Sequence, residues 1–353
     1  MAKTLYDALV AISSSGNYSV ETEYATTPVE LLVIENDTTY SANTNLGNTT
    51  PDMYMLGVHY KGNLTINSGV TVTAAARKRG MIIIVDGDCN INGTLTMTNR
   101  GANTSVATYP SLSDSERTQR ILILQNNDVD LEIPAFGGLG ALGKVGVGIG
   151  LIGSNGVDGG TGGGGSGGCK IYDSGTPTSG TGAQGTSFSG GAGSGATFTY
   201  ETPATGNAGT LYGGKGSDAY QDGGGGGGGA GNPTGIRNKL GLNGTGGLLI
   251  LIVLGSLNIG STGIVSANGC KGGGSDRDRY SEPGGGGSGG GSVNIFSVGI
   301  FTNAGTVQAL GGQGNGDDNV NYAGGSGGAG SIRVMQISPP SATAIKRRFA
   351  QII

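Results

Sequence analysis

Three stretches of the sequence share one pattern of apolar residues and glycines. Residues 81–97 read MIIIVDGDCNINGTLTM, residues 249–265 read LILIVLGSLNIGSTGIV, and residues 293–309 read VNIFSVGIFTNAGTVQA. Each contains a strand, a glycine at the same place, a short alternating strand, a turn with glycine and a third strand. A shorter copy begins at Gly62. A recurring unit that cannot bury its own apolar face predicts stacked coils, that is, a β-solenoid or a related β-sandwich.

The alternation within these copies predicts which side chains point inward. The first set of equivalent inward positions is Leu64, Cys89, Leu257 and Phe301, and the second is Ile66, Ile91 and Ile259. Asn303 interrupts the second set. Residues 121–124 and 129–133 are also strand-like, and we expect them to supply one more coil.

Composition narrows the classes of protein that the chain fits. Charged residues make up 12% of the 353 residues, tryptophan is absent, and His59 is the one histidine. Hydrolases and metalloenzymes build their sites from these groups, so we expect no catalytic residues, no metal site and no cofactor. A net charge of -4 provides no basic field for nucleic acid. The most apolar run, residues 248–254, is too short to cross a membrane, so we expect no membrane insertion.

The cysteines Cys89, Cys169 and Cys270 are far apart and lack the spacing of a zinc site or a disulfide framework. We therefore predict three free thiols. The alternation described above assigns Cys89 to the core.

Glycine divides the chain near Pro134, because only nine of the 77 glycines lie in residues 1–134. We expect an N-terminal helix and attachment region over residues 1–53, a β-repeat body over 54–134, a glycine-rich domain of polyglycine II helices and further β-repeats with exposed loops over 135–338, and a C-terminal tail over 339–353. The absence of a sustained Gly-X-Y period excludes collagen.

Four dense glycine runs occupy the second part of the chain. They are residues 159–168, 223–231, 284–291 and 324–330. Two physical states fit such runs, a disordered Gly/Ser coil or polyglycine II helices packed side by side. Only glycine lets such helices approach closely enough for main-chain hydrogen bonds between them. Two of the runs pass directly into the strand-like segments 292–298 and 331–337, which favours the ordered state. The predicted fold class is therefore all-β, with solenoid-like or sandwich repeats and packed polyglycine II helices.

Glycine runs separated by short loops that bear aromatic residues resemble the distal tail-fibre adhesins of T-even-like bacteriophages. The resemblance covers about residues 137–337 and rests on the runs GGTGGGGSGG, GGGGGGGAG, GGGGSGGG and GGSGGAG. It implies a polyglycine II sandwich whose loops bind the host receptor. The β-repeats and the long, glycine-poor N-terminal region depart from that family.

If the runs form a scaffold, the connecting loops carry recognition. The candidate receptor-binding residues are Tyr172, Tyr200, Tyr212, Tyr220, Asp276, Arg277, Arg279, Tyr280 and Tyr322. Tyrosine offers a flat apolar face and a hydroxyl, which suit a sugar ring or the outer loops of a surface protein. The alternative is that these tyrosines cover the edges of the glycine slab and that the charged loop is merely solvated.

Both ends of the chain are candidates for attachment to a particle. Leu5, Leu9 and Ile12 form one face of a short N-terminal helix that needs a partner, either the β-body or another virion protein. Ile345, Phe349 and Ile352 repeat that spacing near the C-terminus.

The expected function is that of a virion structural protein, a tail-tip or tail-fibre adhesin that binds a glycan or an outer surface protein of the host. It would leave the host by lysis, since no secretory signal is evident. A monomer and a trimer fit equally well. One alternative is a capsid decoration or baseplate protein that does not bind the host. Another is a polysaccharide depolymerase that uses the carboxylate pair Asp86 and Asp88, or Asp128 and Asp130.

Overall fold

The protein is described by a computed structural model. The residues whose structure is described are 5–15, 19–22, 25–27, 29–49, 55–76, 78, 80–101, 120–125, 130–135, 246–269, 290–312 and 331–337. These residues are mostly strand, with one helix, and most of the strands lie in parallel sheets. The predicted all-β class is confirmed.

The strands recur in sets of three, and we call each set a coil. A coil has one six-residue strand, the long strand, followed by two strands of three or four residues. Coil 1 is β3 (Val29–Ile34), β4 (Thr38–Tyr40) and β5 (Thr44–Leu46); coil 2 is β6 (Met55–Tyr60), β7 (Leu64–Ile66) and β8 (Thr71–Ala74); coil 3 is β9 (Gly80–Val85), β10 (Cys89–Ile91) and β11 (Thr94–Thr96). Coil 4 is β14 (Leu248–Val253), β15 (Leu257–Ile259) and β16 (Ile264–Ser266); coil 5 is β17 (Ser292–Ser297), β18 (Phe301–Asn303) and β19 (Thr306–Gln308). Strand β20 (Ser331–Gln336) adds one more long strand.

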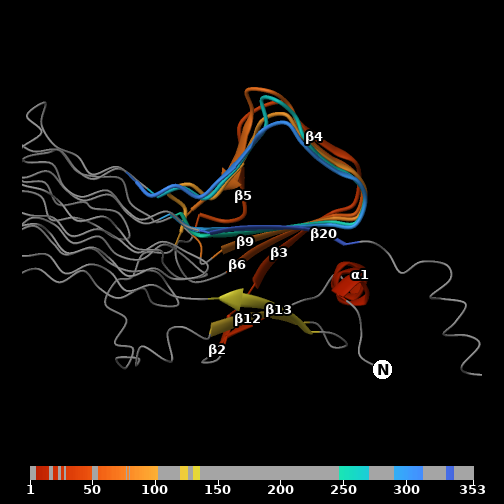
Figure 1. The fold of residues 1–353 in the computed structure, drawn as a ribbon, viewed down its shortest axis with the longest axis vertical. Coiled ribbons are helices and arrows are strands. Elements are labelled where there is room, and N and C mark those ends of the chain that lie inside the picture. The colour runs from red at the N-terminus through yellow and green to blue at the C-terminus, as the bar shows by residue number, and fades with distance from the viewer. Residues whose placement is uncertain are drawn as a thin grey trace, which may run out of the picture.

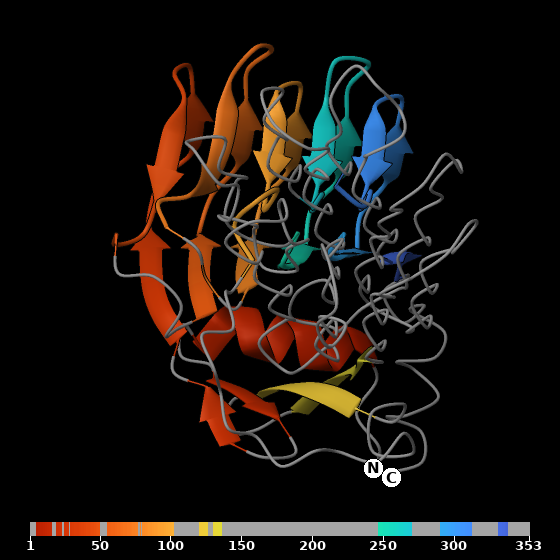
Figure 2. The ribbon, with the colours of Figure 1, turned by 90° about the vertical axis from the view of Figure 1, so that its left-hand side faces the viewer.

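Each coil contributes one strand to each of three parallel sheets. The long sheet has the order β20-β17-β14-β9-β6-β3, the middle sheet β18-β15-β10-β7-β4, and the third sheet β19-β16-β11-β8-β5. In Figure 1 the coils lie over one another and share a triangular outline, and Figure 2 shows them side by side as a stack. Coils 3 and 4 are neighbours in the stack although residues 97–247 separate their strands in sequence.

The register agrees with the repeats read from the sequence. Cys89 pairs with Leu64 on one side and Leu257 on the other, and Leu257 pairs with Phe301. In the long sheet Leu249 pairs with Met81 and with Val293. Asn303 is opposite Ile259, and its side chain is exposed at the end of the stack. The predicted equivalences are therefore confirmed residue by residue.

Glycine makes this close stacking possible at the corner after each long strand. The column contains Gly62, Gly87, Gly255 and Gly299, one from each of coils 2 to 5. The amide of Gly255 donates to the carbonyl of Gly87 at 3.1 Å, and the amide of Gly299 donates to that of Gly255 at 3.0 Å. A Cβ on Gly255 would lie 2.4 Å from the Gly87 oxygen, which is too close for any side chain. Coil 1 has Asn36 at this position, where no earlier coil lies beneath it.

The four inner long strands, β6, β9, β14 and β17, are buried on both faces. Their inward side chains form the core inside the coils, and their outward side chains form a second apolar cluster with helix α1 (Leu5–Ser15). This double burial explains the continuous apolar runs, such as residues 81–85 and 248–253.

Helix α1 lies across the long sheet in the direction of stacking (Figure 2). Leu9 and Ile12 are fully buried in the cluster that contains Ile82, Ile84 and Ile250. The expectation that these two residues mount the protein on a particle is thus corrected, since their apolar face is covered by the protein's own sheet. The side chain of Leu5 lies outside the described residues.

A polar contact joins the same helix to the sheet. The hydroxyl of Ser13 donates to Oδ1 of Asp86, and Nε2 of the buried His59 lies 2.9 Å from the same oxygen. Histidine and serine both bind the carboxylate here, so this is not the chain of contacts that a catalytic triad uses.

Residues 120–135 do not form the additional coil that the alternation predicted. Strand β12 (Arg120–Gln125) pairs antiparallel with β13 (Asp130–Ala135) and with β1 (Ser19–Thr22), which also pairs with β2 (Ala25–Thr27). These four strands form a separate sheet, and β13 is one edge of it. The edge position tolerates Pro134, which has no amide hydrogen to donate.

The coils also begin earlier than expected. Coil 1 starts at Val29, inside the region that the sequence assigned to attachment. Residues 120–135 belong to the separate sheet and not to the coils. The predicted start of the repeats at residue 54 is therefore wrong, and so is the inclusion of residues 120–134 in the first repeat body. No helix among the described residues is both long enough and apolar enough to cross a membrane.

Candidate functional site: the corner that carries the insertions

The long, glycine-rich connections all occupy the same place in the repeat. Each leads from a third-sheet strand to the next long strand, a position that we call the insertion corner. The connections there span residues 97–247, 267–291 and 309–330, whereas the first two are only 47–54 and 75–79. Because every coil has the same order of strands, the ends of all three long connections meet at one corner of the stack.

The outgoing ends of these connections continue the hydrogen bonding of the third sheet. The amide of Ala267 donates to the carbonyl of Gln308 at 3.0 Å, and the amide of Gly269 donates to that of Leu310 at 2.8 Å. The amide of Asn99 likewise donates to the carbonyl of Asn268 at 3.1 Å. The chain therefore leaves the stack as parallel segments that are bonded main chain to main chain.

The returning ends pack against the outgoing ends. The amide of Gly291 donates to the carbonyl of Ala267 at 2.7 Å, and the amide of Ser292 donates to that of Gly247 at 2.8 Å. The first of these bonds joins the two ends of the connection 267–291. The second joins the residue after that connection to the end of the connection 97–247. A Cβ on Gly291 would lie 1.8 Å from the Gly247 oxygen, and one on Gly246 would lie 2.0 Å from the Ala267 oxygen. Glycine is required here because the backbones themselves are in contact.

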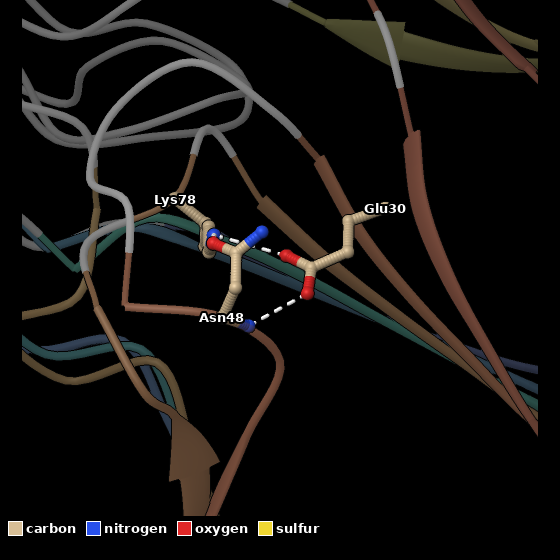
Figure 3. Close-up of polar contacts among 3 residues, drawn as sticks. All are labelled: Glu30, Asn48 and Lys78. Atoms are coloured by element: carbon tan, nitrogen blue, oxygen red, sulfur yellow. Dashed lines mark hydrogen bonds and ion pairs between the residues drawn. The ribbon is translucent and has the colours of Figure 1, made fainter.

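A buried lysine lies at the same corner, beside the start of the first long connection. The amide of Lys78 donates to the carbonyl of Arg100 at 2.8 Å, and Lys78 forms a parallel bridge with Gly101. Its side chain is fully buried. The Nζ of Lys78 lies 3.1 Å from Oε2 of Glu30 and 2.7 Å from Oδ1 of Asn48 (Figure 3).

The two oxygens of the Glu30 carboxylate bind two different residues, Lys78 and Asn48. Its Oε2 accepts from Lys78, while its Oε1 accepts from the amide of Asn48 at 2.6 Å. Gly47 precedes Asn48 with a φ of 78°, and a Cβ there would lie 2.8 Å from Cδ1 of Leu56. The backbone around Asn48 is therefore fixed by the carboxylate on one side and by the glycine on the other.

The nine candidate receptor-binding residues, from Tyr172 to Tyr322, lie outside the described residues. The same is true of Asp128, Cys169 and Cys270 and of the four glycine runs, except for Gly290 and Gly291 at the end of one run. Their predicted roles remain predictions. Among the described residues, no group of histidine, cysteine, aspartate or glutamate could hold a metal ion.

The carboxylates of Asp86 and Asp88 bind separate parts of the chain. Asp86 contacts Ser13 and His59, whereas Oδ1 of Asp88 accepts from the amide of Ser256 at 2.7 Å. Asp88 belongs to a ladder at the glycine-column corner, in which each acid or amide side chain accepts from the next coil. Oδ1 of Asp37 accepts from the amide of Asn63 at 2.8 Å, and Oδ1 of Asn63 accepts from that of Asp88 at 2.7 Å.

Cys89 lies in the core, as predicted. It is fully buried and makes no disulfide, and burial raises the pKa of its thiol to about 12. A thiol with so high a pKa is almost entirely protonated near neutrality, so Cys89 is unsuited to nucleophilic chemistry.

Glu30, Asn48 and Lys78 were not identified from the sequence. They are far apart in the chain, and Lys78 lies between Arg77 and Arg79, which is typical of a solvated basic patch. One signal was present, namely a charged residue, Glu30, inside the apolar segment 29–34.

Comparison of the chain with protein-family models, with curated protein sequences and with solved structures found no match.

Proposed function

We propose that the chain is a β-solenoid that mounts packed polyglycine II helices at its insertion corner and acts as a virion adhesin. In this proposal the coils and helix α1 are the base, and the loops between the glycine runs bind the surface of the host cell. The observation that carries the proposal is the common origin of the three glycine-rich connections at one corner, with ends that hydrogen-bond main chain to main chain.

Two features of the corner support packed polyglycine helices over a loose coil. Bonds run in two directions there, along the stack from Gly269 to Leu310 and across a connection from Gly291 to Ala267. Polyglycine II helices in a slab need such lateral bonds, because one helix alone makes none within itself. The contacts at Gly246 and Gly291 also hold the described ends of two connections at fixed positions, so a chain segment that begins and ends there loses less entropy on ordering than a free one does.

An adhesin suits this arrangement better than an enzyme does. A rigid base that presents several loops from one corner is a common way to build a recognition surface. The described carboxylates Asp86 and Asp88 are bound by the protein's own groups and do not face one another across a substrate site. The proposal therefore includes no catalysis.

The test is competition for adsorption. The purified full-length chain is added to the bacteria that the parent particle infects, and residual particle adsorption is measured. We expect the chain to reduce adsorption, and we expect the quadruple variant Asp276→Ala, Arg277→Ala, Arg279→Ala, Tyr280→Ala to compete at least tenfold less well. The matched control is Ser68→Ala, at an exposed bend between the middle and third sheets.

The alternatives give different results. A chain that neither binds the cells nor competes with the particle would be a non-binding component, such as a decoration or baseplate protein. Release of reducing ends from host polysaccharide would indicate a depolymerase. Either result would overturn the adhesin proposal.

A further inference from the structure

The polar cluster around the buried Lys78 at the insertion corner brings together the three groups that an amide exchange requires. Lys78 supplies an amine, Asn48 a carboxamide, and Glu30 a carboxylate in contact with both residues. Figure 3 shows the Lys78 nitrogen beside the Asn48 carboxamide, with the Glu30 carboxylate facing both residues. A nucleophile, an electrophile and a base within hydrogen-bond reach form the arrangement from which nucleophilic catalysis proceeds.

We propose that Lys78 and Asn48 join in an intramolecular isopeptide bond, with Glu30 as the catalytic acid and base. Glu30 takes a proton from the Lys78 ammonium, and the neutral Nζ attacks Cγ of Asn48. Glu30 then returns a proton to Nδ2. The Nζ–Cγ bond forms, the Cγ–Nδ2 bond breaks, and ammonia leaves as ammonium with the second proton of Nζ. Nothing is oxidised or reduced, and no other reactant is required.

The geometry removes most of the entropic barrier to this step. The amine is held 2.7 Å from Oδ1 of Asn48, the oxygen bonded to the carbon that it would attack. Reactants fixed in this way correspond to effective molarities of about 10⁵ M or more.

The surroundings suit the departure of the leaving group. Lys78 is fully buried and the Glu30 side chain is 17% exposed, whereas Asn48 lies at the surface. The reacting amine is thus shielded from water, while the ammonia is released directly into solvent.

The bond would join the first coil to the base of the longest insertion. Asn48 follows strand β5 of coil 1, and Lys78 pairs with residues 100–101, at the start of that insertion. A load applied to the insertion would then pass into the stack through a covalent link and not through hydrogen bonds alone. This role is independent of whether the loops bind a receptor.

Mass spectrometry of the intact, full-length protein tests the proposal. We expect the mass to be lower than the sequence mass by one ammonia, after allowance for removal of Met1. Trypsin should release the peptide of residues 4–61 with the dipeptide Lys78–Arg79 attached, because no lysine or arginine lies between residues 4 and 60. Fragment spectra should locate the branch at Asn48. A folded protein with the full sequence mass would overturn the proposal and leave the cluster as an ion pair.

Variants separate this reaction from other losses of ammonia. Lys78→Arg keeps the charge beside Glu30 but removes the primary amine, and Glu30→Gln keeps the size but removes the base, so both should show the full sequence mass. Lys61→Arg is the matched control and should retain the loss. Persistence of the loss in Lys78→Arg or in Glu30→Gln would also contradict the proposal.

Discussion

The two corners that flank each long strand use glycine in the same way but differ in what they allow the chain to do. After the long strand, three residues lead to the middle sheet in all five coils, and the glycines of coils 2 to 5 stack in an unbroken column. Before the long strand, the connection ranges from the short segment 75–79 to the long segment 97–247. Backbone contact at Gly291 is nevertheless as close as at Gly255. Variation in length at one corner therefore does not imply loose packing there.

The largest effects should come from adding a methyl group to the glycines of either corner. Gly255→Ala and Gly291→Ala each place a Cβ against a carbonyl oxygen of the neighbouring segment, so we expect each to lower the free energy of unfolding by about 3 kcal/mol. Denaturant unfolding measures both. Asn36→Ala, at the equivalent place in coil 1, should stay within about 0.5 kcal/mol of the unsubstituted protein.

The free energy of unfolding of Gly291→Ala tests whether the insertion corner is packed as tightly as the glycine-column corner. A loss at Gly255 without a loss at Gly291 would mean that the insertion corner can move aside, and that its glycines are not needed for contact.

A smaller effect is expected where helix α1 meets the long sheet. Leu9→Ala removes a fully buried side chain from the outer apolar cluster, so we expect a loss of about 2 kcal/mol. Thermal unfolding would report it. Val10→Ala, on the half-buried side of the same helix, should cost less. Equal losses for the two variants would argue against the packing described for this helix.

The side-chain ladder at the glycine-column corner should contribute less again. Asn63→Ala leaves the amide of Asp88 without its acceptor at an exposed position, so we expect a loss of about 1 kcal/mol in the free energy of unfolding. An unchanged value would show that water replaces the side chain without cost.

The same ladder predicts a weak dependence of stability on pH. Hydrogen bonds from the backbone amide and then the side chain of Asn63 lower the pKa of Asp37 from its ordinary 3.8. The stabilisation is therefore present above that ordinary value and is lost as the pH falls through the lowered one. The difference in melting temperature between the unsubstituted protein and Asp37→Asn should shrink over this acid range. A difference that grows on acidification would contradict the assignment.

The sequence allowed coils 2 to 5 to be predicted better than coil 1. Gly87, Gly255 and Gly299 mark the same corner in successive coils, and aligning them fixed the register. Coil 1 was missed because Asn36 replaces the corner glycine, which is tolerated where no earlier coil lies beneath. Strands β12 and β13 were mistaken for a coil because alternation is the same in parallel and antiparallel strands.

The cluster of Glu30, Asn48 and Lys78 could not be predicted for a different reason. Glu30, Asn48 and Lys78 meet only because coils 1 to 3 are stacked, and no local spacing records that contact. For the apolar face of helix α1, by contrast, the sequence did indicate that a contact exists. Its apolar spacing correctly predicted a partner, but only the fold could show that the partner is the protein's own long sheet.

Amide hydrogen exchange at the two corners is the most direct test of main-chain packing at the insertion corner. The amides of Gly269 and Gly291 are bonded as well as those of Gly255 and Gly299. We therefore expect all four amides to exchange with protection of the same order. Exchange of Gly269 and Gly291 at the rate of an unstructured peptide, with Gly255 and Gly299 still protected, would contradict the account.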